Sequence, residues 1–210
     1  MIERKFVLEK IKEYQIQEFI ASHLKGAGHS YTKVQRTPLG EKIVIYTSRP
    51  GLVVGRRGEN IRMLTELLKT NFDLENPQIE IGEVENIYTD PKIMAEAIAT
   101  SLERFGTNKF KGIAHKIMGD AIKAGAVGVE IRISGKVPSS RAKSWRFYSG
   151  YLKKCGEVVS TIVKTAYAAA KLKTGVIGIK VSVVPPGIEL PDDIKISEIK
   201  EEVKDESKDE

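Results

Sequence analysis

Hydrophobic and polar positions follow a helical period at the start of the chain and a strand period after it. Apolar side chains recur every three or four positions in residues 4–24, which predicts an amphipathic helix. The positions expected to face inward are Val7, Ile11, Tyr14, Phe19, Ile20 and Leu24. Residues 31–36 and 42–47 favour two strands, and Pro38 and Gly40 fit the second and fourth places of a type I turn between them.

The following segment returns to the helical period and then alternates again. After a short apolar run at residues 52–54, residues 59–69 predict a second amphipathic helix. Its apolar side carries Ile61, Leu64, Leu67 and Leu68. Ile79 and Ile81 alternate with polar residues, which predicts a half-buried strand.

Two further helices and several strands are predicted in the second part of the chain. Asp90 followed by Pro91 is typical of a helix start, because Asp caps a helix and Pro fits its first turn. The inward positions of the two helices are Met94, Ile98, Leu102 and Phe105, then Phe110, Ile113, Ile117 and Ala121. Strands are expected at residues 127–134, 141–151 and 176–184. Residues 158–173 are β-branched first and alanine-rich later, which we interpret as a strand running into a short helix.

This order of elements predicts an α+β protein built from two α/β sandwich domains, each a small sheet with helices packed on one side. We place the first domain at residues 1–88 and the second at residues 89–188. Residues 189–210 are poor in aromatic residues and rich in Glu, Asp and Lys, which predicts an acidic, disordered tail. The length of 210 residues agrees with one or two domains.

Charge is distributed unevenly between these parts. Residues 1–90 hold 13 basic and 13 acidic residues, whereas residues 91–190 hold 17 basic and 6 acidic ones. The last 20 residues hold 4 basic and 9 acidic ones. A strongly basic middle segment indicates a polyanionic partner, because lysines and arginines that merely solvate a surface would be spread evenly.

Other features exclude several classes of protein. The single cysteine, Cys155, cannot form an intramolecular disulfide or a multi-cysteine metal site. It also shares no metal-ligand spacing with any histidine. We therefore expect no metal and no cofactor. No apolar run approaches the ~18 residues of a membrane span. The first residues are charged and lack the apolar core of a secretory signal. We therefore expect a soluble, cytoplasmic chain without a membrane partner.

The corner Gly55-Arg56-Arg57-Gly58 combines features that suit a nucleic-acid backbone. Two glycines permit a tight turn that phosphates can approach closely. The corner opens the helix at residue 59, whose first amide groups add a partial positive charge, and the two arginines can reach phosphate oxygens. Two other pairs of glycines at this spacing enclose apolar residues and are interpreted as glycine stops before buried strands. The glycine spacing matches neither a dinucleotide-binding nor an NTP-binding loop.

With this corner, the sequence of predicted elements resembles a KH domain of the second topological type. The motifs that follow are GVEIRISGK at residues 128–136, SRAKS at residues 140–144 and GVIGIKV at residues 175–181. Together they resemble the family of small-subunit ribosomal protein three, in its archaeal rather than bacterial form. The resemblance covers residues 1–190 and leaves only the acidic tail outside it.

The resemblance implies a structural protein in the head of the small ribosomal subunit, without enzymatic activity and located on ribosomes in the cytoplasm. Its implied partners are ribosomal RNA (rRNA), messenger RNA (mRNA) at the path by which it enters, and neighbouring head proteins. The RNA-binding candidates that it implies are Gly55, Arg56, Arg57, Gly58, Lys136, Arg141, Lys143 and Arg146. Bacterial relatives carry an arginine pair on the second helix of the second domain, where this chain keeps Lys111 and Lys116 alone. The family is also implicated in unwinding mRNA structure at this entrance. The missing arginine pair weakens that expectation, and it leaves the expected attachment to RNA unchanged.

Aromatic residues lie among the basic residues 141–146, a mixture that can stack on bases. Strand alternation places Trp145 and Phe147 on one face and Arg146 and Tyr148 on the other. We expect the first pair to pack in the core, and we take Arg146 and Tyr148 as the RNA candidates.

Two alternatives come from other functional classes. Eukaryotic relatives have been linked to DNA cleavage at damaged sites, and a lyase needs an amine with a lowered pKa, but no lysine here stands beside a distinctive acid or base. A free-standing KH regulator of mRNA would repeat the KH unit or attach an unrelated effector domain. This chain instead continues into one basic domain.

Overall fold

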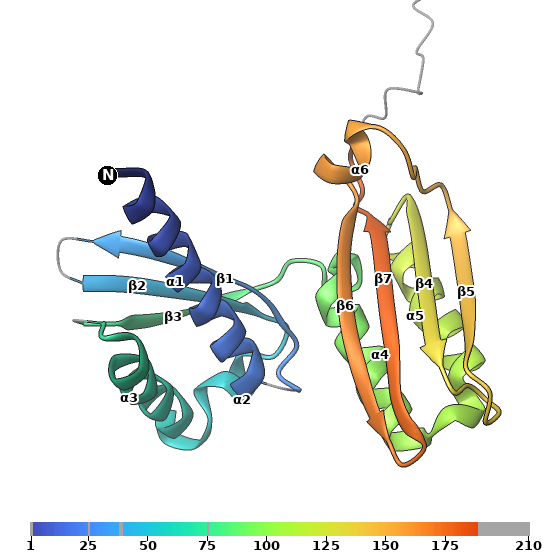
Figure 1. Ribbon diagram of the computed structural model, residues 1–210, viewed down its shortest axis with the longest axis horizontal. Helices are drawn as coiled ribbons and strands as arrows, with labels where there is room; N and C mark the ends of the chain where they lie inside the picture. The colour runs from blue at the N-terminus through green and yellow to red at the C-terminus, as the bar shows by residue number, and fades with distance from the viewer. Residues whose placement is uncertain (1, 25, 38–39, 75, 189–210) are drawn as a thin grey trace, which may run out of the picture.

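The computed structural model describes residues 2–24, 26–37, 40–74 and 76–188, which form two α/β domains (Figure 1). Each domain is one sheet with helices packed on one face, so the predicted pair of sandwiches is confirmed. None of the described helices is long and apolar enough to cross a lipid bilayer.

The first domain has a three-stranded sheet in the order β1-β2-β3, with β1 antiparallel and β3 parallel to β2. Its elements are α1 (Ile2–His23), β1 (His29–Thr37), β2 (Gly40–Thr47), α2 (Pro50–Val54), the 3-10 turn η1 (Arg56–Gly58), α3 (Glu59–Phe72) and β3 (Gln78–Glu83). Ile43 of β2 is paired with Ile79 of β3, and Ile45 with Ile81, so both strands turn apolar side chains to one face. Helices α1 and α3 cover that face and complete the core. Pro38 of the predicted turn lies outside the described residues.

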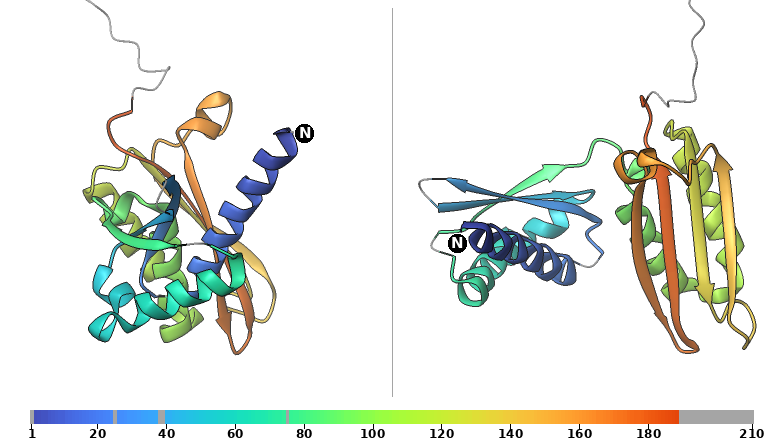
Figure 2. Two further views of the ribbon diagram at one scale, coloured as in Figure 1. Left: turned by 90° about the vertical axis from the view of Figure 1, so that its left-hand side faces the viewer. Right: turned by 45° about the horizontal axis from the view of Figure 1, so that its top comes forward.

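Helix α1 packs on the sheet through its second half. Ile16 and Ile20 are buried, whereas Val7, Ile11 and Tyr14 are exposed. The inward position predicted for these three residues is therefore wrong. The N-terminal end of α1 projects beyond the sheet (Figure 2, left). Periodicity identifies the apolar face of a helix, but the extent of the sheet decides how much of that face is covered.

The second domain has a four-stranded antiparallel sheet in the order β5-β4-β7-β6. Its elements are η2 (Ile87–Thr89), α4 (Pro91–Phe105), η3 (Thr107–Lys109), α5 (Phe110–Lys123), β4 (Gly128–Gly135), β5 (Lys143–Gly150), α6 (Glu157–Thr161), β6 (Lys164–Leu172) and β7 (Gly175–Val184). The predicted start of α4 is confirmed, because the Asp90 carboxylate accepts a hydrogen bond from the Lys92 N–H at 2.9 Å. Helix α4 packs on β6 and β7, and α5 packs on β4 and β5, whereas neither helix covers the opposite face of the sheet, here called the uncovered face (Figures 1 and 2). Part of the segment between β5 and β6 lies against one end of that face, where Lys154 meets Glu130.

Two predictions for this domain are wrong. Residues 157–161 form the short helix and residues 164–172 form the strand, which is the reverse of the predicted order. Pairing of β6 with β7 overrides the helical preference of the alanines, and the small Ala166, Ala168 and Ala170 pack against the core on the side where α4 crosses β6. Phe105 is 56% exposed rather than inward, because it is the last residue of α4. The Arg104 and Lys109 cations lie over its ring.

The two domains meet where β1 and α4 begin. The Ser30 hydroxyl donates to the Asp90 carboxylate, and the Lys92 ammonium donates to Nδ1 of His29 at 3.1 Å. Because Nδ1 accepts, Nε2 of His29 carries the proton and donates to Thr32 Oγ1 at 2.8 Å. Burial, with a smaller contribution from the nearby Lys92 charge, lowers the pKa of His29 from 6.5 to about 4. The junction therefore contains a histidine that is neutral at neutral pH.

Candidate nucleic-acid interface

The glycine corner is a sharp reversal between α2 and α3. Gly55 has φ 73° and ψ −175°, a conformation open almost exclusively to glycine. Gly58 is left-handed with φ 77°, and helix α3 begins directly after it. The Asn60 side chain donates to the Leu52 carbonyl at 3.1 Å and so ties α3 back to α2 across the corner. The corner is thus a fixed turn rather than a loose loop.

Both arginines of the corner point away from the core. Arg56 and Arg57 are exposed, and neither forms an ion pair with any described residue. Arg57 also adopts a left-handed backbone with φ 55°, which costs an ordinary residue about 1 kcal/mol. A charged side chain in an unfavourable backbone conformation, without an ion-pair partner among the described residues, contributes little to folding, so Arg57 stays a candidate for binding.

The two glycines of the corner should respond differently to substitution. A Cβ on Gly55 would lie 2.6 Å from the Asn60 amide, whereas a Cβ on Gly58 would meet no atom within 4 Å. We expect Gly55→Ala to lower the free energy of unfolding by about 2 kcal/mol, through strain plus the clash, and Gly58→Ala by about 1 kcal/mol, through strain alone. Urea unfolding followed by circular dichroism measures both. Equal losses would show that the clash with Asn60 adds nothing to the backbone strain at Gly55.

The basic candidates of the second domain divide into groups. Lys136 and Arg141 lie in the loop that joins β4 to β5, and Lys143 opens β5 opposite Gly135. Lys111 reaches this end of the hairpin from α5, where its ammonium lies 5.0 Å from the centre of the Trp145 ring. These four cations, here called the hairpin-end group, belong to or reach the β4–β5 end of the sheet, and none makes an ion pair with a described residue. Lys116 is exposed farther along α5.

The predicted sidedness of β5 is confirmed. Phe147 is buried, and Trp145 is half-buried and donates its indole N–H to the Val137 carbonyl at 3.0 Å. Arg146 and Tyr148 are exposed on the uncovered face of the sheet, with the Arg146 guanidinium 4.7 Å from the centre of the Tyr148 ring. Arg146 and the hairpin-end group therefore occupy different parts of the domain rather than one continuous surface.

Glu130 organises the uncovered face. Its carboxylate is almost fully buried and forms ion pairs with Lys154 at 2.6 Å, Arg146 at 3.0 Å and Arg132 at 3.3 Å. Burial alone would raise the pKa of Glu130, but the interactions with Lys154 and Arg146 outweigh it and hold the pKa below its usual value. The carboxylate stays ionised and fixes the cations around it.

Sequence reasoning missed Arg132, Lys154, Tyr167 and Lys180 as members of this face. Alternation along β4 and β7 was the available signal for Arg132 and Lys180, but it does not tell which residues meet across strands. Tyr167 lies in the segment whose secondary structure was wrongly predicted. The ion pairs of Glu130 depend on strand register, which the sequence pattern does not contain.

Comparison with known proteins decides the family. The family model described as "KH domain" matches residues 15–87, and the one described as "Ribosomal protein S3, C-terminal domain" matches residues 98–183. A "Small ribosomal subunit protein uS3" from Methanocaldococcus jannaschii is 44% identical over 198 residues, covering 94% of each chain. The protein of that name from Methanococcus maripaludis is 41% identical over 203 residues, 96% of this chain and 95% of the relative. The one from Methanosphaera stadtmanae is 43% identical over 94% of this chain and 78% of its own length.

The chain belongs to the uS3 family. The resemblance seen in the sequence, including its archaeal form, is thereby confirmed, as are the KH character of the first domain and the ribosomal type of the second. The stretch matched as a KH domain contains the glycine corner, and the stretch matched as the S3 domain contains the hairpin-end group together with Arg146 and Tyr148.

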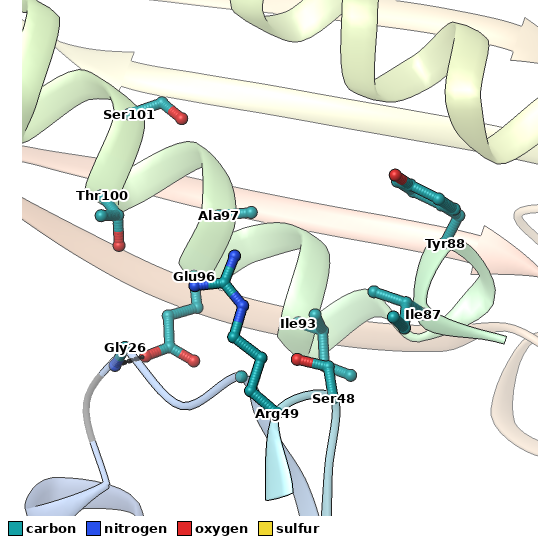
Figure 3. Close-up of a pocket in the computed structure, with 11 residues that line it drawn as sticks. Gly26, Ser48, Arg49, Ile87, Tyr88, Ile93, Glu96, Ala97, Thr100 and Ser101 are labelled. Atoms are coloured by element: carbon teal, nitrogen blue, oxygen red, sulfur yellow. Dashed lines mark hydrogen bonds between the residues drawn. The ribbon is translucent and has the colours of Figure 1, made fainter. Parts of the chain in front are cut away.

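A groove lies between the two domains of this uS3-family chain. It has a volume of about 370 Å³, and Figure 3 shows Arg49 extending from the first domain toward α4. The Glu96 carboxylate in the groove accepts a hydrogen bond from the Gly26 N–H at 2.6 Å. No lysine lines the described walls of this groove, whereas Lys92, whose pKa is lowered by burial, lines two neighbouring hollows of about 660 and 610 Å³. Within the described part of the chain, no three His, Cys, Asp or Glu residues are grouped to hold a metal ion.

Proposed function

We propose that this protein is a structural component of the small ribosomal subunit in the cytoplasm, where it binds rRNA in the head of the subunit. The proposal is carried by the alignment, over nearly its whole length, with relatives named "Small ribosomal subunit protein uS3". The excess of 11 positive charges in residues 91–190 supports a polyanionic partner. The role is architectural, and no residue is assigned to catalysis.

At the level of residues, we assign phosphate contacts to two places. In the first domain, Arg56 and Arg57 extend from a corner where Gly55 and Gly58 let a backbone approach closely. In the second domain, the hairpin-end group supplies four cations that pair with no acid in the described part of the chain, and Lys116 and the Arg146–Tyr148 pair add contacts on other sides. Cations that no described acid neutralises are available to release counterions from RNA.

The finer part of the proposal concerns mRNA and the domain plan. We propose that the protein lines the path by which mRNA enters, beside neighbouring head proteins, with a KH domain at residues 1–88 and a basic domain at residues 89–188. An acidic tail at residues 189–210 completes this plan. Two separate cationic sites on one chain support it, because one site can hold rRNA while the other faces a second strand.

Reconstitution with ribosomal subunits tests the proposed function. The purified chain should co-sediment with small subunits depleted of their own uS3 protein, and it should stay bound through a moderate salt wash. Salt weakens every phosphate contact, so a chain that stays bound through the wash must also be held by its fit to folded RNA and by protein neighbours, which a single exposed cationic patch lacks. Release at low salt, or equal binding to large subunits, would contradict the proposal and favour a regulator that visits RNA transiently.

A further inference from the structure

We infer that the uncovered face of the second sheet binds an unpaired nucleotide of an RNA strand, with its base against Tyr167 and its phosphates on Arg132 and Lys180. This inference rests on the proposed function and deepens it by naming a nucleotide site outside the corner and the hairpin-end group. Three features of the face carry it: a row of cations, the distribution of their counter-charge, and a hollow beside them.

The cations form one row across the whole sheet. Arg146 of β5 is paired in register with Arg132 of β4, Arg132 with Lys180 of β7, and Lys180 with Tyr167 of β6. Like charges directly opposite each other destabilise a sheet. Such a row is stabilised when an anion lies across it, and a phosphate backbone is a series of anions.

The counter-charge on this face is unequally shared. Glu130 is the sole acidic residue of the four strands, and it pairs with Arg146, Arg132 and Lys154. Lys180 pairs with no described acid, and its ammonium lies 5.2 Å from the centre of the Tyr167 ring. The positive field is therefore least compensated at the Tyr167 end of the row.

A hollow adjoins that end of the row. In the next row, small residues meet: Ser134 faces Gly178, and Gly178 faces Ala169. The hollow that they leave measures about 460 Å³, with Tyr167, Arg132 and Lys180 around it. This volume is within the range of sites that hold small molecules. The Tyr167 side chain is 71% exposed, so one face of its ring is open for stacking.

The chemistry favours a nucleotide over an acidic peptide. An extended peptide recognises the free backbone groups of an edge strand, whereas this hollow lies on the face of the sheet, over β4, β7 and the edge strand β6, and offers side chains rather than free backbone groups. An apolar floor beside an exposed aromatic ring fits the flat face of a base, which every nucleotide has. Cations at the rim fit the phosphate on either side of that base.

Binding of fluorescein-labelled octauridylate to the full chain tests the inference by anisotropy. Tyr167→Ala should weaken binding about tenfold, within the range that one lost stacking contact costs. Tyr167→Phe keeps the ring and should bind within about twofold of the natural chain. Lys180→Gln should lower the slope of log K against log salt by about 0.7, the value for one phosphate of a single strand. Tyr167 is exposed and Lys180 is half-buried, and circular dichroism verifies that the three variants are folded.

The matched control is Tyr14→Ala, which removes an exposed tyrosine from α1 and should leave binding unchanged. The inference is overturned if Tyr167→Ala binds octauridylate as the control does, or if the natural chain does not bind it. It is also overturned if an octaglutamate peptide binds with the same dependence on Tyr167, since the face is then a site for acidic proteins. Co-sedimentation of Tyr167→Ala with small subunits is measured in parallel. A chain that still co-sediments but shows no Tyr167 effect loses this inference alone and keeps the proposed function.

Discussion

Reversing both charges of the glycine corner, in Arg56→Glu/Arg57→Glu, should weaken binding of a 16-nucleotide single-stranded RNA by the full chain roughly 50-fold at 0.1 M salt. Each phosphate contact on a single strand changes log K by about 0.7 per tenfold change in salt. At 0.1 M salt, tenfold below 1 M, the loss of two contacts therefore weakens binding roughly 25-fold, and repulsion from the two new carboxylates weakens it further. Fluorescence anisotropy at several salt concentrations measures both the affinity and the salt slope, which should fall by about 1.4.

The matched control for this experiment is Arg4→Glu/Lys5→Glu. These two adjacent cations are exposed on the projecting end of α1 and make no ion pair with a described residue, so the change in net charge is the same. The control should lose a few-fold in affinity through the general field of the protein. Equal losses in the two variants would mean that the corner is a structural turn and that net charge alone governs binding.

Arg57→Gly separates binding from folding at the same corner. Glycine adopts the left-handed conformation of residue 57 without strain, which offsets the extra flexibility that glycine gives the unfolded chain. The free energy of unfolding should therefore change by less than about 1 kcal/mol while RNA affinity falls about fivefold. A large loss of stability would show that the Arg57 side chain supports the fold.

Local chemistry made much of this molecule predictable from its sequence. The Asp90 cap, the glycine corner and the alternation in β4, β5 and β7 depend on residues close together in the chain, and the structure places each of them as predicted. Such signals depend on capping, backbone conformation and strand alternation, which neighbouring residues determine.

Features that depend on the whole sheet were not predictable. Glu130 alternates on the polar side of β4, and nothing in that pattern shows that the structure brings Arg146 and Lys154 onto it and buries it. The alanines of β6 favour a helix locally, and β7 together with the space beneath α4 makes them a strand. Pairing between distant segments decided both outcomes.

The charge pattern was informative about the partner but not about the surface. An excess of positive charge in residues 91–190 indicates a polyanion, while the structure distributes those cations over the hairpin end, the uncovered face and α5. The same distribution explains why Arg132, Lys180 and Tyr167 were missed, since their proximity exists only after the strands pair.

Acid should weaken the folded protein through His29 at the domain junction. Its pKa is about 4 in the folded state against 6.5 as the ordinary value, so the unfolded chain takes up a proton first as the pH falls. The stability that neutral His29 contributes is complete above pH 6.5 and is lost as the pH falls toward 4. At about 1.4 kcal/mol for each pKa unit, the loss amounts to about 3 kcal/mol. Urea unfolding at pH 7, 6, 5 and 4.5, followed by circular dichroism, measures it.

His29→Gln isolates this contribution, because the Gln amide can accept from Lys92 and donate to Thr32 but does not take up a proton in this range. The free energy of unfolding of this variant should fall less steeply between pH 6.5 and 4 than that of the natural chain. The acidic side chains are common to both proteins, so the difference between the two curves is the contribution of His29 to stability. His23→Gln, which replaces an exposed histidine at the end of α1, should follow the natural curve. Parallel curves for the natural chain and His29→Gln would mean that the junction opens and lets water reach His29 before the domains unfold, so that its burial adds nothing to the stability that urea measures.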